Sequence, residues 1–248
     1  MTRPSFINEL DWKLLIEKYK GKKLKRIVKK IENNYPVQYA IGNVEFLNCN
    51  IIVNSSVLVP RFETELLVDK LKKYIIKYNM RSSKILDLCT GSGCIGISLK
   101  KEFTSSSVTC IDKSYRALRT AKKNAKRNNV SITLKRRDIL KQVIKGKYSI
   151  LVSNPPYLVK GDYVTPNTKA EPSMALYTKN SDIEFYIRIL DMSKELLYSS
   201  NIIAFEIGAN QSERICSYVK TIYPDAKIIV EKDYNELERY IFIFNNIE

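Results

Sequence analysis

The chain has 248 residues, of which 44% are hydrophobic and 27% charged, enough for one good core and a small appended unit. It contains no histidine, and its five cysteines form no C-x-x-C pair, so we expect no histidine general base, zinc site or disulfide framework. No apolar stretch reaches the length of a membrane span, and the opening residues lack the apolar core of a signal peptide. We therefore expect a cytoplasmic protein with no membrane or metal partner.

The formal net charge is +16, and the basic residues gather in three clusters. The clusters are Lys20, Lys22, Lys23, Lys25, Arg26, Lys29 and Lys30; Lys122, Lys123, Lys126 and Arg127; and Lys135, Arg136 and Arg137. One interpretation is weak contact with RNA or the ribosome, or with an acidic surface of a protein substrate. The other is a solvated surface that reflects a lysine-rich composition. Both stay open at this point.

Residues 1–34 predict two short helices that form a small cap or docking unit over residues 1–35. The second helix carries an apolar stripe at helical spacing, formed by Leu24, Ile27, Val28 and Ile31. We expect the first helix to pack through Trp12, Leu14 and Leu15.

Residues 36–60 predict a connecting hairpin, with strands at 44–46 and 51–53 around Asn48 and Asn50. A helix over residues 63–78 follows. Arg61 and Glu63 lie at its start, and they either shape a substrate pocket or form a structural ion pair there, where an acid is favoured. The sequence favours neither alternative.

Residues 84–103 predict a strand, a glycine loop and a helix. The strand covers 85–88 and the helix 94–103, while Gly91 and Gly93 let the backbone come close to a ligand because they carry no Cβ. Cys89 stands where the first glycine of such loops is usual. A lone glycine loop is a weak signal, since dinucleotide-binding folds use the same device.

Acids end the next two predicted strands, 108–112 and 132–135. Asp112 lies about 20 residues beyond the loop, where a carboxylate can accept from ribose hydroxyls. Asp138 and Ile139 are suited to the amino edge and the face of an adenine. Each acid alone is more often a solvated strand end, but in this order they predict a nucleoside site.

Asn154-Pro155-Pro156-Tyr157 follows an apolar strand at 148–152. The prolines remove two backbone donors, so the carbonyls of the turn stay free to accept, and Asn154 adds a side-chain acceptor. This turn is suited to holding an NH2 group flat against Tyr157, although a proline turn packed for stability is the alternative. The predicted nucleoside site lacks the lysine-containing loop that binds phosphates. Together, that site and this turn indicate S-adenosylmethionine as the cofactor and methyl transfer to an amide or amino nitrogen.

Alternating elements in the remaining chain predict a mainly parallel sheet covered on both faces. The predicted helices lie at 114–128, 181–198 and 211–223, and the strands at 202–206, 227–231 and 240–244. The segment 158–180 has no clear periodicity, and loops of this length are usually functional or mobile. We expect it to cover the substrate, with Glu171, Pro172 and Leu176 near the pocket.

Several segments together resemble the protein-(glutamine-N5) methyltransferases that modify peptide chain release factors. They are Pro36-Val37-Gln38-Tyr39 with Ile41-Gly42; Val59 to Glu65, similar to P-R-P-E-T-E with Phe62 for the second proline; Asp87 to Gly93, similar to D-L-G-T-G-S-G; Asn154-Pro155-Pro156-Tyr157; and Phe205-Glu206-Ile207-Gly208 with Gln211. They span residues 35–245. The pair P-R-x-E-T-E and N-P-P-Y is specific, whereas either motif alone is shared more widely among methyltransferases.

The resemblance implies an α/β fold of the class I, Rossmann-like S-adenosylmethionine-dependent methyltransferases, with a short N-terminal helical unit (1–35), a β-hairpin connector (36–60) and a methyltransferase domain (61–248). It also implies that the last two strands form an antiparallel edge pair. With the strand ends above, it places Asp87, Cys89, Thr90, Gly91, Ser92, Gly93, Asp112, Asp138, Ile139 and Asn154 at the cofactor. It places Asn154, Pro155, Pro156, Tyr157, Arg61 and Glu63 at the substrate.

The leading hypothesis is methylation of the glutamine in a release factor's Gly-Gly-Gln loop. Asn154 Oδ1 and the Pro155 carbonyl would accept the two amide N–H bonds, and Tyr157 would hold the amide plane. The alternative is methylation of a nucleic-acid amino group, adenine N6 or guanine N2, with a flipped base stacked on Tyr157. A non-catalytic RNA-binding factor on a methyltransferase scaffold is a third possibility, indicated only by Cys89.

Overall fold

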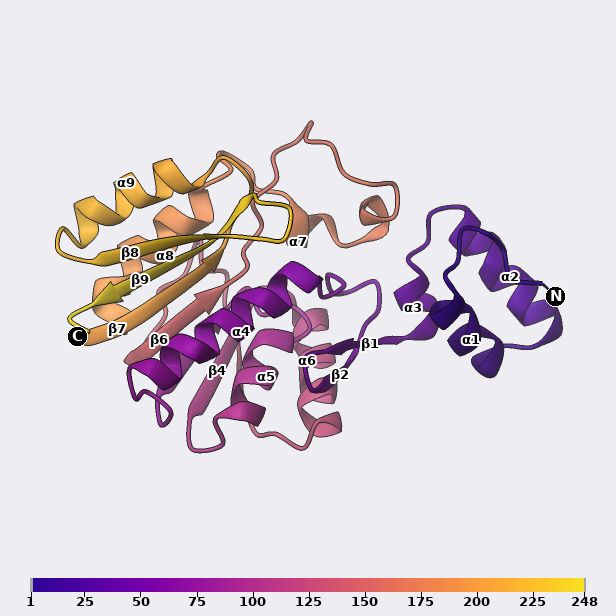
Figure 1. Ribbon diagram of the computed structural model, residues 1–248, viewed down its shortest axis with the longest axis horizontal. Helices are drawn as coiled ribbons and strands as arrows, with labels where there is room; N and C mark the ends of the chain where they lie inside the picture. Colours follow the sequence, from indigo (N-terminus) through magenta and orange to yellow (C-terminus); the bar gives the residue numbers. More distant parts are fainter. Residues whose placement is uncertain (1, 248) are drawn as a thin grey trace.

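The computed structural model describes residues 2–247, and its centre is a seven-stranded sheet with helices on both faces (Figure 1). Met1 and Glu248, the outer ends of the predicted units 1–35 and 61–248, lie outside the described residues. The strands are β3 (Lys84–Leu88), β4 (Ser107–Asp112), β5 (Thr133–Arg136), β6 (Tyr148–Ser153), β7 (Leu197–Glu206), β8 (Lys227–Lys232) and β9 (Glu238–Asn245).

The strand order in this sheet is β5-β4-β3-β6-β7-β9-β8. The five strands from β5 to β7 in that order pair in parallel. Strand β9 is antiparallel to both β7 and β8. The predicted class I α/β fold is confirmed, and the last two strands form the antiparallel pair at one edge.

Two helical layers bury the sheet from opposite sides. Helices α4 (Phe62–Lys77), α5 (Cys94–Glu102) and α6 (Tyr115–Arg127) pack on one face, and α8 (Glu184–Leu196) and α9 (Ser212–Ile222) pack on the other. Neighbouring strand residues enter different cores, as Ile85 and Leu86 do. Because both faces are covered, the strands are continuous apolar runs, and this is the pattern that located them in the sequence.

The strand order reverses at β3, and this reversal positions the site. From β3 the chain passes through α5 to β4 and through α6 to β5, and then returns to β6 on the other side of β3. Connections that diverge in this way leave a crevice at the carboxyl ends of the strands, the usual ligand position in open α/β sheets.

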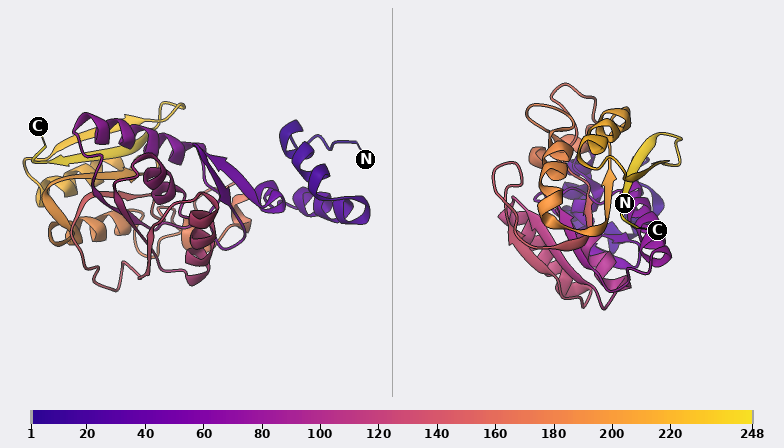
Figure 2. Two further views of the ribbon diagram at one scale, coloured as in Figure 1. Left: turned by 90° about the horizontal axis from the view of Figure 1, so that it is seen from below. Right: turned by 90° about the vertical axis from the view of Figure 1, so that its left-hand side faces the viewer.

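The N-terminal unit has its own small core and projects from one end of the molecule (Figure 2). Its helices are α1 (Glu9–Lys18), α2 (Gly21–Glu32) and α3 (Val37–Ile41). Ala40 and Ile41 pack with α1 and α2, so we place the end of this unit at Ile41 rather than at residue 35. The predicted packing of Leu14 is wrong: Trp12 and Leu15 are buried, whereas Leu14 is 37% exposed.

The connector is a hairpin of β1 (Asn43–Phe46) and β2 (Cys49–Ile52), whose turn is Leu47-Asn48. Asn50, expected at the turn, lies inside β2. Two amide side chains of α6 pair with the outer edge of β2. Asn128 exchanges hydrogen bonds of 3.0 and 2.9 Å with the Asn50 backbone, and Asn124 exchanges bonds of 2.7 and 3.1 Å with that of Ile52. Because these residues are one helical turn apart, they act as a substitute strand for an otherwise unpaired edge.

The boundary between α8 and β7 also differs from the expectation of a helix over 181–198. The helix ends at Leu196, and Leu197 is already extended, with ψ of 151°, and pairs with Tyr148 of β6. The segment 158–180 is a folded excursion rather than a free loop. It contains a short 3-10 turn (Thr168–Ala170) and α7 (Ser173–Leu176), and the pairing of Leu158 with Tyr177 closes it.

The basic clusters lie on exposed surfaces of α2, of α6 and of the region of edge strand β5. Among the helices described between residues 2 and 247, none is both long and apolar enough to cross a membrane.

We expect Asn124→Ala to lower the free energy of unfolding by about 3 kcal/mol, because it leaves buried peptide groups of the hairpin without partners. Asn124 is fully buried, and its Nδ2 also donates to the Ser92 carbonyl at 2.8 Å. Urea denaturation measures the loss, with the exposed neighbour Lys123→Ala as the control. Equal stability of the two variants would contradict this role of the asparagine.

Candidate active site

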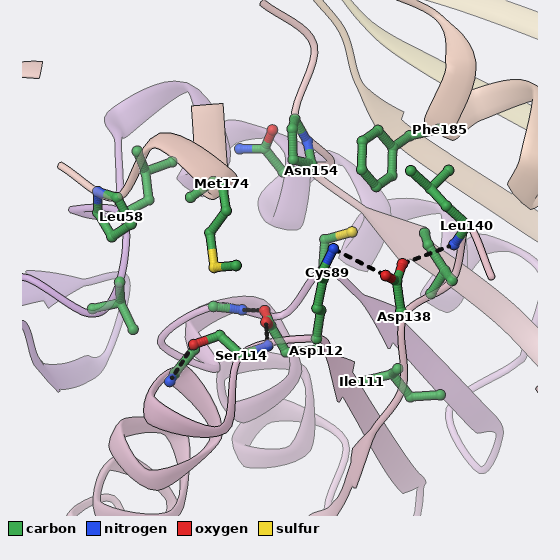
Figure 3. Close-up of a pocket in the computed structure, with 18 of the residues that line it drawn as sticks. Leu58, Cys89, Ile111, Asp112, Ser114, Asp138, Leu140, Asn154, Met174 and Phe185 are labelled. Atoms are coloured by element: carbon green, nitrogen blue, oxygen red, sulfur yellow. Dashed lines mark hydrogen bonds and ion pairs between the residues drawn. The ribbon is translucent and has the colours of Figure 1, made fainter. Parts of the chain in front are cut away.

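A crevice opens at the carboxyl ends of β3, β4 and β6 (Figure 3), which is the usual place of a ligand in open α/β sheets. Of the predicted cofactor residues, six line it: Cys89, Gly91, Asp112, Asp138, Ile139 and Asn154. The other four are not part of its lining: Thr90, Ser92 and Gly93 belong to the glycine loop, and Asp87 lies beneath it. The three strand ends chosen from the sequence thus meet at one crevice, but the sequence did not distinguish residues of its lining from residues behind it.

Asp87 lies beneath the glycine loop and is fully buried. Its Oδ2 accepts from the Thr90 hydroxyl and, at 3.0 Å, from the Gly96 N–H, while Oδ1 has no partner among the described residues. Burial raises the pKa of this carboxyl to about 7. A Cβ at Gly96 would lie 2.4 Å from the Cys110 sulfur, so only glycine lets α5 approach the carboxylate this closely.

Asp112 joins the glycine loop to the start of α6. Its two carboxylate oxygens accept from the N–H groups of Gly91 and Ser114, at 2.8 and 2.7 Å. Burial raises the pKa of Asp112, against the lowering effect of these bonds. Each carboxylate oxygen keeps a further lone pair, so Asp112 can also accept from ligand hydroxyls in the crevice that it lines.

Asp138 lies across the crevice from the loop, in contact with the residue that follows Asp112. Lys113 Nζ is 2.9 Å from its Oδ2, and the Leu140 N–H donates to Oδ1 at 3.2 Å. Burial acts to raise the pKa of Asp138, but the hydrogen bond and charge of Lys113 outweigh it and hold the pKa below its usual value. The carboxylate stays ionised beside Ile139 and remains available to an amino group.

Cys89 has the backbone conformation that the usual glycine would have, with φ of +59°. Its sulfur points towards the space between Asn154 and Phe185 (Figure 3), and its side chain packs on the core beneath α8. Burial raises the pKa of the thiol well above its usual value. The side chain thus fills part of the crevice wall as a neutral group while the loop keeps its left-handed turn, at a conformational cost of about 1 kcal/mol.

The turn after β6 is held from both sides. Ser153 donates to the Leu88 carbonyl at 2.7 Å, which ties β6 to β3 at the sheet edge. Gln211 Nε2 donates to the Tyr157 carbonyl at 3.2 Å, and its Oε1 accepts from the Gly208 N–H at 2.8 Å. A Cβ at Gly208 would lie 3.0 Å from the Tyr157 ring. Burial, with a smaller contribution from Glu206, raises the pKa of Tyr157 to about 12, so its hydroxyl is neutral.

Within this turn the predicted residues take different places. Asn154 and Pro156 line the crevice, whereas Pro155 and Tyr157 are not part of its lining. Asn154 Nδ2 donates to Thr64 Oγ1 at 3.1 Å. Thr64 in turn donates to Glu206 Oε2 at 2.7 Å. The sequence contained both partners, inside the two segments of the family resemblance, but gave no reason to assign them a role.

Arg61 pairs with Glu171 of the segment 158–180, so the suggested ion pair with Glu63 is wrong. Glu171 is 5% exposed and also accepts from the Val59 N–H at 2.9 Å. Burial raises its pKa, opposed by the charge of Arg61. Arg61 and Glu63 are not part of the crevice lining, and the Arg61–Glu171 pair fastens the segment to the start of α4.

That fastening brings part of the segment over the crevice. Pro172 lines it as expected, and Leu176 is buried outside the lining. The lining residues that sequence reasoning missed are Ser56, Val57, Leu58, Met174, Ala175, Tyr177 and Phe185, with others around them. They carry no motif: three follow the hairpin connector, three belong to the segment 158–180, and Phe185 lies on α8, so tertiary packing brings them to the crevice. Within residues 2–247 no cluster of three or more histidine, cysteine or acidic side chains is suited to a metal ion.

We expect the free energy of unfolding to fall as the pH rises from about 4 to about 7. Folded Asp87 holds its proton up to about pH 7, whereas its usual pKa is 3.8, so ionisation in this range costs the folded state more than the unfolded chain. The Asp87→Asn variant should lose less free energy of unfolding than wild type over this pH range. The difference is at most about 4 kcal/mol. Urea denaturation between pH 5 and pH 8 measures it.

Glu206, with its pKa raised to about 7 by burial, keeps a slope in the same direction in the Asp87→Asn variant. The exposed Asp225→Asn is the control for the removal of one carboxylate. If Asp87→Asn leaves the pH dependence of the free energy of unfolding as it is in wild type, Asp87 does not titrate as described.

Comparison with known proteins agrees with this geometry. The family model "Methyltransferase small domain" matches residues 62–170. In fold, a methyltransferase from Pyrococcus furiosus is similar, with a TM-score of 0.60 and 17% identity, covering 90% of this chain and 99% of that one. A 16S rRNA N2 G1207 methyltransferase from Thermus thermophilus is also similar, with a TM-score of 0.57 and 13% identity, covering 82% of this chain and 50% of that one, which shows the fold alone.

Relatives with closer sequences carry one name. The release factor glutamine methyltransferase of Bacteroides thetaiotaomicron is 34% identical over 87% of this chain and 79% of its own length. That of Lactococcus lactis is 34% identical over 96% of this chain and 89% of its own length. The chain belongs to the family of release factor glutamine methyltransferases.

Proposed function

We propose that this enzyme transfers a methyl group to the side-chain amide nitrogen, N5, of the glutamine in the Gly-Gly-Gln motif of peptide chain release factors. The observation that carries the proposal is the Asn154 side chain, which lines the crevice and uses its NH2 group within the protein. Its Oδ1 is then available to a substrate that presents N–H bonds. The names of the relatives support a release factor as the protein that carries the glutamine.

S-adenosylmethionine is the cofactor, and when bound it supplies an electrophilic methyl group on a sulfonium. The residues of the crevice fit its nucleoside part. Asp112 is positioned to accept from the ribose hydroxyls, because its oxygens keep lone pairs free at the end of β4. Asp138 stays ionised and is suited to the adenine amino group, while Ile139, which also lines the crevice, would contact the ring. Gly91 lets the backbone come close to the ligand.

The substrate amide nitrogen is a poor nucleophile because its lone pair is delocalised. We assign Asn154 Oδ1 and the Pro155 carbonyl as acceptors for its two N–H bonds. As nitrogen gains positive charge during transfer, its N–H bonds become better donors, so fixed acceptors stabilise the transition state more than the ground state. Tyr157, neutral and held by Gln211, would restrain the plane of the amide.

The segment 158–180 would exclude water from this reaction. The Arg61–Glu171 pair and the Leu158–Tyr177 pairing hold it beside the crevice, and Pro172 lines the wall. In this proposal Arg61 and Glu63 act on the substrate indirectly, by setting the position of the segment and the start of α4. The basic clusters carry no part of the proposal.

Methyl transfer from labelled S-adenosylmethionine tests the function, with a purified release factor, its Gln-to-Ala variant in the Gly-Gly-Gln motif, and total RNA as acceptors. We expect label on the intact factor alone. Label on RNA alone would replace the proposal with methylation of a nucleic-acid amino group.

In the same assay, Asn154→Ala should lower kcat by about 100-fold, the usual effect of losing one fixed transition-state hydrogen bond. The Kd for S-adenosylmethionine, measured by calorimetry, should change by less than about threefold, because Asp112 and Asp138 remain. A variant that keeps the wild-type kcat would contradict the assigned role of Asn154.

A further inference from the structure

Behind Asn154 a line of hydrogen bonds passes into the protein, and the mechanism above leaves it unused. Asn154 Nδ2 is 3.1 Å from Thr64 Oγ1, and Thr64 Oγ1 is 2.7 Å from Glu206 Oε2. Thr64, on the first turn of α4, and Glu206, the last residue of β7, are each 3% exposed. The line therefore joins the rim of the crevice to a buried carboxylate.

The chemistry of the three groups fixes the direction of every bond in this line. An ionised carboxylate can only accept, so the single hydroxyl proton of Thr64 points to Glu206. The Thr64 oxygen then faces Asn154 with a lone pair, which accepts from the Asn154 NH2. If the amide were turned over, Asn154 Oδ1 would face a Thr64 oxygen whose single proton is already donated to Glu206, and the two sets of lone pairs would repel each other.

We propose that Thr64 and Glu206 are positioning residues that determine which way the Asn154 amide faces, so that Oδ1 rather than the NH2 group meets the substrate. This inference rests on the proposed function and deepens it. A methyl acceptor with an NH2 group needs an oxygen opposite it. If the Asn154 amide were free to turn over, its NH2 group would face the NH2 group of the methyl acceptor for part of the time.

Both partners of Asn154 are anchored independently of it. The Tyr240 hydroxyl donates to the Glu63 carbonyl at 2.9 Å, which fixes the first turn of α4 against β9. The Tyr186 hydroxyl donates to the Glu206 carbonyl at 2.9 Å, which fixes the end of β7 against α8. Thr64 and Glu206 therefore stay in place when Asn154 is exchanged or when substrate binds.

The buried carboxylate is costly to the fold, which argues that its place is functional. Glu206 has no ion pair within residues 2–247, since its charged neighbour Arg239 pairs with Asp233 at 3.1 Å. Burial raises the pKa of Glu206 to about 7, with Thr64 acting in the opposite direction. Groups with such shifts concentrate at functional sites. The carboxylate is largely ionised at pH 8, where the direction of the line is fixed.

Three variants assayed at pH 8 test the proposal on the acceptor that the wild-type enzyme methylates. Thr64→Val keeps the shape and removes the hydroxyl, and we expect kcat to fall by about 10- to 100-fold. Thr64→Ser restores the hydroxyl and should stay within about threefold of wild type. In Glu206→Gln the new amide can donate to Thr64, and Thr64 can then donate to Asn154 Oδ1. Because this reversed set of hydrogen bonds becomes possible, kcat should fall by about tenfold.

The pattern across these variants separates positioning from a structural role. The Kd for S-adenosylmethionine and the melting temperature should be those of wild type in Thr64→Ser, and the Kd should be within about threefold of wild type in Glu206→Gln. If Thr64→Val does not fold, Glu206→Gln decides. Wild-type kcat in the folded Thr64→Val or in Glu206→Gln would overturn the proposal, as would a Thr64→Ser enzyme as slow as Thr64→Val.

A second readout does not depend on the methyl acceptor. In 15N-labelled protein, the side-chain NH2 of Asn154, assigned by its loss in Asn154→Ala, should exchange slowly with solvent in wild type and Thr64→Ser. It should exchange faster in Thr64→Val and Glu206→Gln. Equal exchange in all four proteins would overturn the proposal even if no acceptor were methylated. Failure of wild type to label a release factor, with the exchange pattern intact, would remove only the proposed function.

Discussion

Hydrogen bonds on both sides hold the turn that follows β6 at the carboxyl ends of the strands. The position of each protein group proposed to bind the substrate depends on these bonds. Ser153 ties the strand to β3, and Gln211 holds the Tyr157 carbonyl from the other side. Between these bonds lie two prolines, which have no backbone N–H and whose carbonyls can only accept. The fold thus presents acceptors at a fixed place, which is the requirement for holding an NH2 group without a catalytic base.

The two halves of the site use the same device, a buried carboxylate behind a polar loop. Asp87 lies beneath the glycine loop on the cofactor side, and Glu206 lies behind Asn154 on the substrate side. Burial raises the pKa of both carboxyls to about 7. Asp87 holds Thr90 of the loop and Gly96 of α5, and Glu206 accepts from Thr64, the partner of Asn154. Burying each carboxylate lowers the stability of the folded protein, and in return the groups bonded to it have a fixed orientation. Such local costs are common at functional sites.

The sequence predicted the elements whose signal is local. Apolar runs located the parallel strands, and residue types at strand ends brought Asp112, Asp138 and Asn154 to one crevice. What it missed depends on contacts between distant segments. The pairing of Arg61 with Glu171 joins residues more than one hundred positions apart, and Phe185 reaches the crevice only because α8 packs there. The exposure of Leu14 likewise depends on where α3 packs, which periodicity does not specify.

The proposed mechanism requires Asn154 Oδ1 and the Pro155 carbonyl to accept the two N–H bonds of a glutamine side chain. A crystal structure with S-adenosylhomocysteine and a peptide containing Gly-Gly-Gln would show these contacts. We expect both oxygens within about 3.2 Å of the glutamine nitrogen, with that nitrogen facing the sulfur. A glutamine nitrogen bound elsewhere, or an Asn154 that presents its NH2 group to the substrate, would contradict it.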